Sequence, residues 1–471
     1  MYRYAIGVFA ALLMTSSGAP GSCDSELPAR HLSGMPNAVQ GADDKLITKG
    51  ALEMITKRAE GARVQIDIRG LLQQAHGAPP LLCGLAAEAL GNGRWGGWGS
   101  HWGDAPSPPI GAAASVRARA FPRGDEMVPS EVRFLLDSIG SPDACVREFA
   151  TRLLGSFGGP AVAEQLATLL GASASSPVVR EAAAMALGLA HEKLAVPSLL
   201  RVLRDELTGV RANAAWALGR LDDGRAVAPI RALVGDEAVE VREAAVAALG
   251  QLDSTSSSTV LQRALREDKA PTVRQNAAWA LGKLEPRDAI ATLASALHSD
   301  ARDDVREMSA WALGSIESKD ALAGLIGALR DSSYRVRETA AWALGSIEDA
   351  SAIAALGDAA GGDARAEVRG TAAWALGQIE RAPAPRGLVK ALSDPVADVR
   401  LKAAWAISEI GDSTALPAVR DAFRRETDSR AKRAQVRAMA RGGRASVEAL
   451  GAMLHDMDPE LRKAAVRGLA G

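Results

Sequence analysis

The sequence predicts an all-helical fold, a right-handed α-solenoid of about eleven helix pairs, each of 31–32 residues. A segment reading R-E-T-A-A-W-A-L-G-S-I at residues 337–347 recurs with small changes from about residue 147 to the C-terminus. Its regular spacing is typical of proteins in which each unit stacks on its neighbours. Ala and Leu favour helix throughout the repeats, and no strand-like alternation competes.

We number each repeat from its basic residue, which is position 0. This position falls at Arg147, Arg180, Arg211, Arg242, Arg274, Arg306, Arg337, Arg369 and Arg400, and then at Lys432 and Arg462. Positions +3, +4 and +6 are usually Ala, +7 is Leu, +8 is Gly and +10 is Ile or Leu. Position +5 is Trp in six units, at Trp216, Trp279, Trp311, Trp342, Trp374 and Trp405.

One unit shows the expected pair of helices. Residues 321–329 are apolar at helical spacing and predict the first helix, and residues 336–347 predict the second. In the first well-formed unit the pair is expected at 131–139 and 146–157. Acidic residues recur six positions before the Arg, as at Asp331 and Asp363, and two positions before it, as at Glu240 and Glu367. At helix starts we expect them to satisfy free N–H groups and to suit the helix dipole.

A helical wheel separates two faces of the second helix. Positions −1, +3, +6, +7 and +10 cluster between about 240° and 340° and predict the buried face. Position +5 lies at about 140°, among the variable positions +1, +2 and +9. The wheel therefore places the Trp side chains opposite the core.

The pattern V-R-x-x-A-A-x-A-L-G-x-I, at residues 336–347 and 368–379, resembles the HEAT-like repeats of the phycobilisome lyase class, also used in artificial α-helical repeat scaffolds. The resemblance covers about 340 residues and implies a HEAT/ARM-type superhelix. In such arrays the second helices line the concave surface. It thus implies that positions +1, +2, +5 and +9 face a groove, in agreement with the wheel.

Residues 1–22 predict a secretory signal peptide, because the apolar run 5–14 is too short to span a membrane stably and small residues follow it. We therefore expect an exported protein, periplasmic or secreted, with no membrane span in the mature chain. An uncleaved apolar N-terminus is the alternative. Lipidation at Cys23 is a further alternative, although Pro20 stands where an aliphatic residue is usual.

Residues 23–129 form the predicted N-terminal region, and 130–471 the repeat array. The region contains a linker, a weak strand at 62–68 with a partner near 116–121, and a degenerate capping repeat at 79–91. A Gly- and Trp-rich segment, 91–104, is either a loop tucked onto the array or an aromatic flap over a ligand. A disulfide between Cys83 and Cys145 is left undecided by the sequence, and export would permit it.

Composition and motifs argue against several classes of function. With 55 basic and 56 acidic residues, the chain has no electrostatic signature of nucleic-acid binding. Deoxyhypusine hydroxylase, a related array, binds two irons through His-Glu pairs, but here the equivalent positions read Arg-Glu, as at Arg337-Glu338. No nucleophile–base pair, phosphate-binding loop or zinc spacing is present, so we expect no catalytic residues, metal or cofactor. A bilin lyase-like enzyme is the alternative, although those enzymes act in the cytoplasm.

The sequence is best interpreted as a non-catalytic scaffold that binds a peptide or protein partner in a Trp-lined groove. A glycan is the second candidate ligand, and the oligomeric state stays open. The alternative role for the Trp residues is packing over the Ala-rich neighbouring helix. The predicted partner-binding residues are the six Trp residues together with Asn213, Gln275, Asn276, Glu307, Glu338, Thr371 and Gln378.

Overall fold

The structure, a computed structural model, describes residues 68–78, 129–252, 254–379, 383–441, 447, 450–451, 454–455 and 459–470. They belong to two compact units, of which the first holds 68–78 and 129–190 and the second begins at residue 191. The predictions for the signal peptide, the linker, the capping repeat and the Gly- and Trp-rich segment lie outside these residues. So does most of the predicted strand at 62–68, whose last residue, Ile68, instead begins a helix.

All regular elements of the described residues are helices, which confirms the predicted all-helical solenoid. The first unit contains α3 (Ile68–Ala75), α6 (Pro129–Ser138), α7 (Ala144–Phe157), α8 (Gly159–Gly171) and α9 (Pro177–Ala190). Here α6 pairs with α7 and α8 with α9, while α3 packs on α7. The opening pair thus lies within two residues of its predicted bounds.

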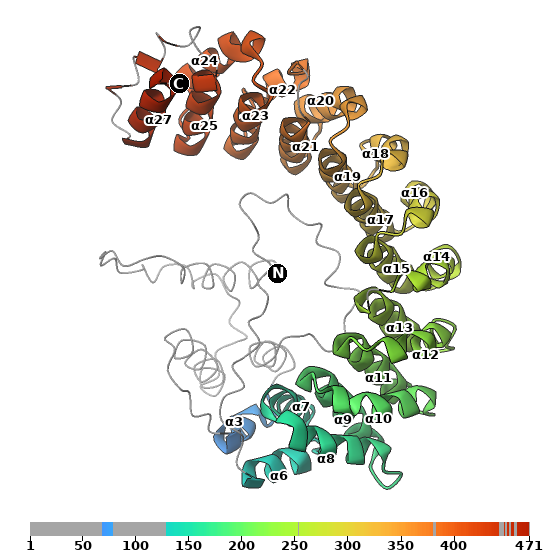
Figure 1. Cartoon of the computed structure of the whole chain (residues 1–471). Helices are drawn as coiled ribbons and strands as arrows, with labels where there is room; N and C mark the ends of the chain where they lie inside the picture. Colours follow the sequence, from blue (N-terminus) through green and yellow to red (C-terminus); the bar gives the residue numbers. More distant parts are fainter. Residues whose placement is uncertain are drawn as a thin grey trace. The chain divides into compact units, whose positions relative to one another are not determined.

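The second unit repeats the same pair. Its first helices are α10 (Val196–Arg201), α12 (Val227–Leu233), α14 (Ser258–Glu267), α16 (Ile290–Ser299), α18 (Leu322–Ala328), α20 (Ile353–Gly362), α22 (Arg386–Ala391) and α24 (Leu416–Arg425). Its second helices are α11 (Thr208–Leu221), α13 (Val239–Gln251), α15 (Pro271–Leu284), α17 (Asp303–Ile316), α19 (Tyr334–Ile347), α21 (Ala366–Gln378), α23 (Ala397–Ile410), α25 (Ser429–Arg441) and α27 (Pro459–Ala470). Each second helix contacts the next, so these helices form one continuous row with the first helices outside it (Figure 1).

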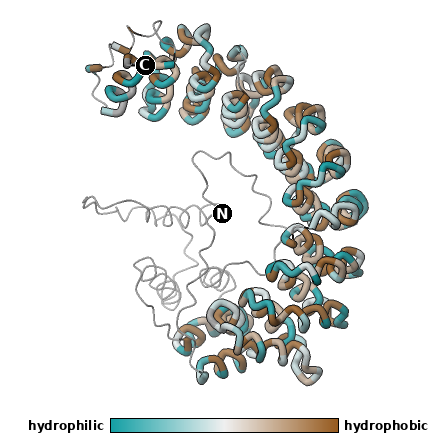
Figure 2. Tube along the Cα trace, viewed as in Figure 1, coloured by the Kyte–Doolittle hydropathy of each residue, from teal (hydrophilic) through white to brown (hydrophobic). Residues whose placement is uncertain are grey.

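The core lies between the two rows and is made of small and branched apolar side chains. In α19, Val336, Ala340, Ala341, Ala343 and Leu344 are completely buried. Four of them occupy positions that the wheel assigned to the core, and Ala341, at +4, extends the buried face beyond those positions. Apolar and hydrophilic residues alternate along the helices of both rows, as expected for helices with one buried face (Figure 2).

Most second helices end in the same way. Position +11 adopts a left-handed backbone at His191, Asp222, Glu285, Glu317, Glu348 and Gly411. A left-handed residue after the last turn satisfies the final carbonyl groups and stops the helix, and Gly adopts it most easily. Glu348, for example, donates its backbone N–H to the carbonyl of Leu344. The turn that follows directs the chain back to the outer row.

Candidate functional site

The solvent-accessible residues of the second helix α19 form a narrow stripe. In α19, Arg335, Glu338, Trp342 and Ser346 are half-buried, while the intervening residues of the helix up to Ile347 are buried apart from Arg337. These four residues occupy positions −2, +1, +5 and +9, which recur every three or four residues and so share one face of a helix. We call the residues at these four positions, from α11 to α25, the inner stripe.

The structure brings most of the predicted binding residues to this stripe, with differing exposure. Half-buried are Trp216, Trp311, Trp342, Trp374, Trp405, Asn213, Glu338 and Gln378. Buried are Trp279, Gln275, Asn276, Glu307 and Thr371, with exposed fractions of 6%, 3%, 1%, 3% and 0%. The expectation that these five side chains are open to solvent is wrong. Whether any of the predicted residues contacts a partner stays a prediction.

The wheel misplaced position +2 in particular. Asn276, Thr339 and Thr371 all occupy it, and all three are buried. A wheel treats the helix as if only one side were covered. In this array each second helix is covered by the outer row and also by a second helix on either side, so only a narrow face remains accessible.

The Trp side chains pack against the preceding helix. A Cβ atom built on Gly345 of α19 would lie 3.0 Å from Trp374 Cζ3 of α21 and 2.9 Å from the Ala375 backbone. The same relation joins Gly250 to Trp279, Gly282 to Trp311, Gly314 to Trp342 and Gly377 to Trp405. Gly at +8 therefore leaves room for the ring edge of the next repeat, so the packing role is present. The rings remain half-buried rather than covered, except that of Trp279.

Several polar atoms near the stripe are buried and make no hydrogen bond within the described part of the chain. They are both amide atoms of Asn276, Nε2 of Gln275 and Oγ1 of Thr339. An unsatisfied buried polar group costs about 1–3 kcal/mol. Proteins retain such groups rarely, and functional sites are one of the places where they do.

Carboxylates of the stripe contact the next helix in three different ways. Glu243 of α13 accepts a hydrogen bond from Thr272 of α15. Glu307 of α17 forms an ion pair with Arg335 of α19, with 3.0 Å between Oε2 and Nε. Glu338 of α19 accepts only a long hydrogen bond, 3.4 Å from Thr371 of α21.

Burial raises the pKa of Glu338, and the negative charge of Glu367 raises it further, against the opposing effects of Lys402, Thr371 and Arg335. The pKa of Glu243 is also raised, chiefly by burial and then by Glu240, although its bond from Thr272 opposes this. A carboxylate with a raised pKa is ionised at neutral pH at some cost to the folded state. The stripe thus contains negative charges that the fold compensates only in part.

We expect Glu338→Gln to raise the free energy of unfolding at pH 7 by about 0.5 kcal/mol. Because the folded pKa of Glu338 is raised, its protonated form is favoured in the folded state, and this stability is lost as the pH rises through the folded pKa. The gain should therefore disappear below the ordinary pKa of 4.5. Urea unfolding of wild type and variant across this pH range measures it. Glu348→Gln, at an exposed helix end, is the control, and an equal gain in both variants would contradict the assignment.

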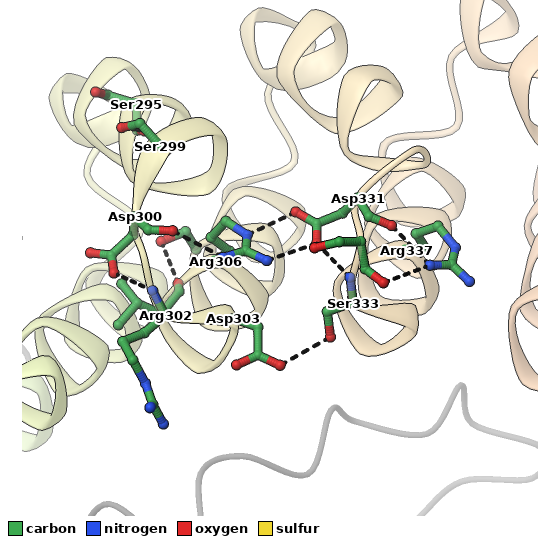
Figure 3. A network of polar contacts seen from close by, with 12 residues as sticks. Ser295, Ser299, Asp300, Arg302, Asp303, Arg306, Asp331, Ser333 and Arg337 are labelled. Carbon is green, nitrogen blue, oxygen red and sulfur yellow. Dashed lines mark hydrogen bonds and ion pairs between the residues drawn. The ribbon is translucent and has the colours of Figure 1, made fainter.

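A ladder of ion pairs joins consecutive repeats along the connections between first and second helices (Figure 3). The Arg at position 0 of one repeat binds the acid at position −6 of the next. The pairs are Arg211–Asp236, Arg242–Asp268, Arg274–Asp300, Arg306–Asp331, Arg337–Asp363, Arg369–Asp394 and Arg400–Glu426. Each is bidentate, which fixes orientation as well as distance.

The ladder corrects the role expected for the acids at position −6. Asp363 does accept one backbone N–H, from Arg365 at 2.8 Å, but α21 begins later, after Arg365, and has no side-chain cap. Burial alone would raise the pKa of Asp363, but the hydrogen bonds from Arg337 and Arg365 and the nearby positive charges lower it overall. The hydrogen bonds from Arg400 lower the pKa of Glu426 to about 2.

One cation of the chain already lies over a stripe Trp. The Arg220 guanidinium is 5.1 Å from the centre of the Trp216 ring, within the range of a cation–π interaction. Arg220 also lies 2.6 Å from the His191 ring nitrogen, and burial, followed by the charge of Arg220, lowers the pKa of His191. One face of the Trp216 ring is therefore accessible to a positive side chain.

The described residues offer no sign of a metal site or a membrane span. These residues contain no group of three or more His, Cys, Asp or Glu side chains placed to hold a metal ion. None of the described helices is long and apolar enough to cross a membrane. Cys145 is disulfide-bonded, and its partner lies outside the described residues.

Comparisons with known proteins agree with the repeat geometry. The family model described as HEAT repeats matches residues 132–209, 196–282, 230–314, 290–377 and 358–440. No curated protein sequence matches the chain.

Solved structures with similar arrays include three of different kinds. Kap95p, in a structure of its binding to RanGDP, is 15% identical, with a TM-score of 0.51 over 92% of this chain and 66% of that chain. An engineered protein is 21% identical over 72% of this chain and 98% of its own, with a TM-score of 0.39. Human deoxyhypusine hydroxylase is 24% identical over 53% of this chain and 96% of its own, with a TM-score of 0.25. At these identities the likeness to Kap95p supports the fold alone.

Proposed function

The chain belongs to the HEAT-repeat family, whose solenoids are scaffolds that bind other proteins, and we propose that it holds a protein or peptide partner along its inner stripe. The observation that carries this proposal is the run of Trp side chains at one equivalent position in five consecutive second helices, α15 to α23. Four of the five rings are half-buried rather than sealed in the core. Aromatic residues with one accessible face are typical of binding hot spots.

The row of second helices suits an extended partner. Each helix adds one set of the same four stripe positions, so a ligand that runs across the row meets a repeating surface. Solenoid proteins use extended surfaces of this kind for binding. Kap95p, a neighbour in fold, is described as binding RanGDP, which supports protein binding by a solenoid of this kind.

We also propose that the scaffold acts outside the cytoplasm, in the cell envelope or as a secreted protein. The apolar run at residues 5–14 followed by small residues supports this location. The disulfide at Cys145 supports it independently, because disulfides persist mainly in oxidising compartments.

Site-specific photocrosslinking in intact cells tests both proposals. A photoreactive residue at Ser346, on the stripe of α19, should capture a protein from the envelope fraction. The same residue at Gly327, exposed on the outer helix α18, should not. Trp342→Leu should reduce capture at Ser346 at least about tenfold, since a hot-spot residue contributes about 2 kcal/mol or more. Equal capture from both positions, or capture only of cytoplasmic proteins, would overturn the corresponding proposal.

A further inference from the structure

The charge of the inner stripe differs sharply from that of the chain. Over α13 to α23 the stripe carries eight acidic residues and two basic ones, a net charge of −6, whereas the whole chain has a net charge of −1. The acids are Glu240, Glu243, Asp304, Glu307, Glu338, Glu367, Asp398 and Glu409, and the bases are Lys283 and Arg335. The negative charge is thus concentrated on the face that carries the Trp residues.

The stripe then reverses its charge at one helix. All four stripe positions of α25 are Arg: Arg430, Arg433, Arg437 and Arg441. Arg430, Arg437 and Arg441 are exposed. Arg441 lies 3.5 Å from a carboxylate oxygen of Glu409 on α23 and forms an ion pair with it, at the end of the acidic part of the stripe. Two stretches of opposite charge therefore follow one another along a single surface.

Part of the acidic charge is already neutralised by neighbouring basic side chains. The ion pairs are Arg335–Glu307, Arg302–Asp304, Arg365–Glu367, Lys402–Asp398 and Arg441–Glu409. Within the described residues, Glu240, Glu243 and Glu338 form no ion pair. The acids without an ion pair thus lie at two places, on α13 and on α19, where the negative charge of Glu367 raises the pKa of Glu338 further.

We propose that the partner presents an extended segment with two basic groups, which lie on α13 and α19, followed by an acidic group that lies on α25. This inference rests on the proposed function. Two contacts within the chain are models for how a basic group of the partner would bind, one to a carboxylate and one to a Trp ring. Arg335 forms an ion pair with Glu307, and a cation of the partner would pair with Glu338 in the same way. Arg220 lies over the Trp216 ring, and a cation of the partner would lie over Trp342 in the same way.

The geometry sets the spacing of these groups. Packed helices lie about 8–10 Å apart. At the upper value of about 10 Å per repeat, three repeats separate α13 from α19, and α19 from α25, by about 30 Å each. An extended chain advances about 3.3 Å per residue. The two basic groups should therefore be about nine residues apart, and the acidic group about nine residues further on. Complementary charge patterns contribute more to the choice of partner and to its register than to affinity.

Synthetic peptides of about twenty residues test the proposal by fluorescence anisotropy with the full chain. One peptide carries two Arg-Lys pairs and an acidic end at this spacing, and it is made in both chain directions. The others are an all-basic peptide, a peptide with every charge reversed and a scrambled peptide of the same composition. The spaced peptide should bind most tightly in one direction, by at least about tenfold over the scrambled peptide, and its affinity should fall as salt rises.

Matched variants assign the two charge blocks separately. The double variant Glu243→Gln with Glu338→Gln should weaken the spaced and the all-basic peptides about tenfold. Arg430→Gln with Arg437→Gln should weaken only the spaced peptide, because the all-basic peptide does not need α25. Both variants replace accessible side chains, and their unfolding curves check that the fold is retained.

Equal binding of the charge-reversed or scrambled peptide, or unchanged binding by both double variants, would overturn the charge pattern. If Ser346 captures a protein partner while none of these peptides binds, the inference fails and the proposed function stands. If neither the peptides bind nor a partner is captured, both fail.

Discussion

Replacing Gly282 by Ala is expected to lower the free energy of unfolding by about 3 kcal/mol, at the upper end of the usual cost of overpacking. The added Cβ would lie 2.6 Å from Trp311 Cζ3, 2.8 Å from Ala312 Cα and 2.9 Å from Ala312 Cβ. A ring edge can shift by rotation, but a backbone atom moves only with its helix. The substitution would therefore separate α15 from α17 along the contact that joins two repeats.

A matched substitution in the outer row separates this effect from helix propensity. Gly327 lies in α18, and a Cβ there would have no atom within 4 Å. Ala at this position should stabilise the protein by about 0.5–1 kcal/mol, because Gly is a poor helix former. Urea unfolding followed by circular dichroism measures both variants. Adding Trp311→Ala to Gly282→Ala should not restore stability, since the Ala312 backbone remains in place. Full restoration would mean that the ring alone sets the spacing.

The period of the sequence was sufficient to predict the fold. An Arg every 31–32 residues, with Ala and Leu at helical spacing after it, determines a helix pair that buries one face against the next pair. The second helix predicted at 336–347 is observed at Tyr334–Ile347. Local patterns succeed here because each repeat contacts mainly its sequence neighbours, so few long-range contacts decide the structure.

The candidate site was predicted less completely. The accessible Trp342 was found because a wheel gives the direction of a side chain. The burial of Asn276 and Thr371 was missed because a wheel contains no neighbouring helices. Gly at +8 is explained by the close approach of the following repeat, whose Ala backbone and, in five units, Trp ring occupy the place of a Cβ. That relation involves two helices and is absent from the pattern of one.

The ion-pair ladder was also missed, although the sequence contained its signal. Asp363 follows Arg337 by 26 residues, and the corresponding separation is 25 or 26 in each of the seven pairs. Acids before a helix are more often caps, and that local interpretation was preferred. When an Arg and an acid keep a constant separation in sequence while the residues between them vary, contact between repeats is indicated.

The ladder explains why consecutive repeats keep a defined spacing although the side chains packed between their helices are small. Arg337 donates to both oxygens of Asp363, at 2.7 and 3.0 Å, and also to the carbonyl groups of Asp331 and Ser332, at 2.8 and 3.3 Å. One guanidinium therefore joins the connection of its own repeat to that of the next. Its side chain is 15% exposed and that of Asp363 is 8% exposed. The loss of either partner would leave a largely buried charge without compensation.

We therefore expect Arg337→Ala to lower the free energy of unfolding at pH 7 by about 3 kcal/mol, as measured for broken buried ion pairs. The folded pKa of Asp363 is lowered, so the stabilisation is present above the unfolded value of 3.8 and is lost as the pH falls through the folded value. The difference between wild type and variant should shrink below about pH 4, as followed by urea unfolding. Arg424→Ala is the control, because the side chains of Arg424 and its ion-pair partner are 76% and 64% exposed. An exposed pair contributes about 0–1 kcal/mol. If both variants lose the same stability, the packing of Ala and Leu alone sets the spacing of the repeats.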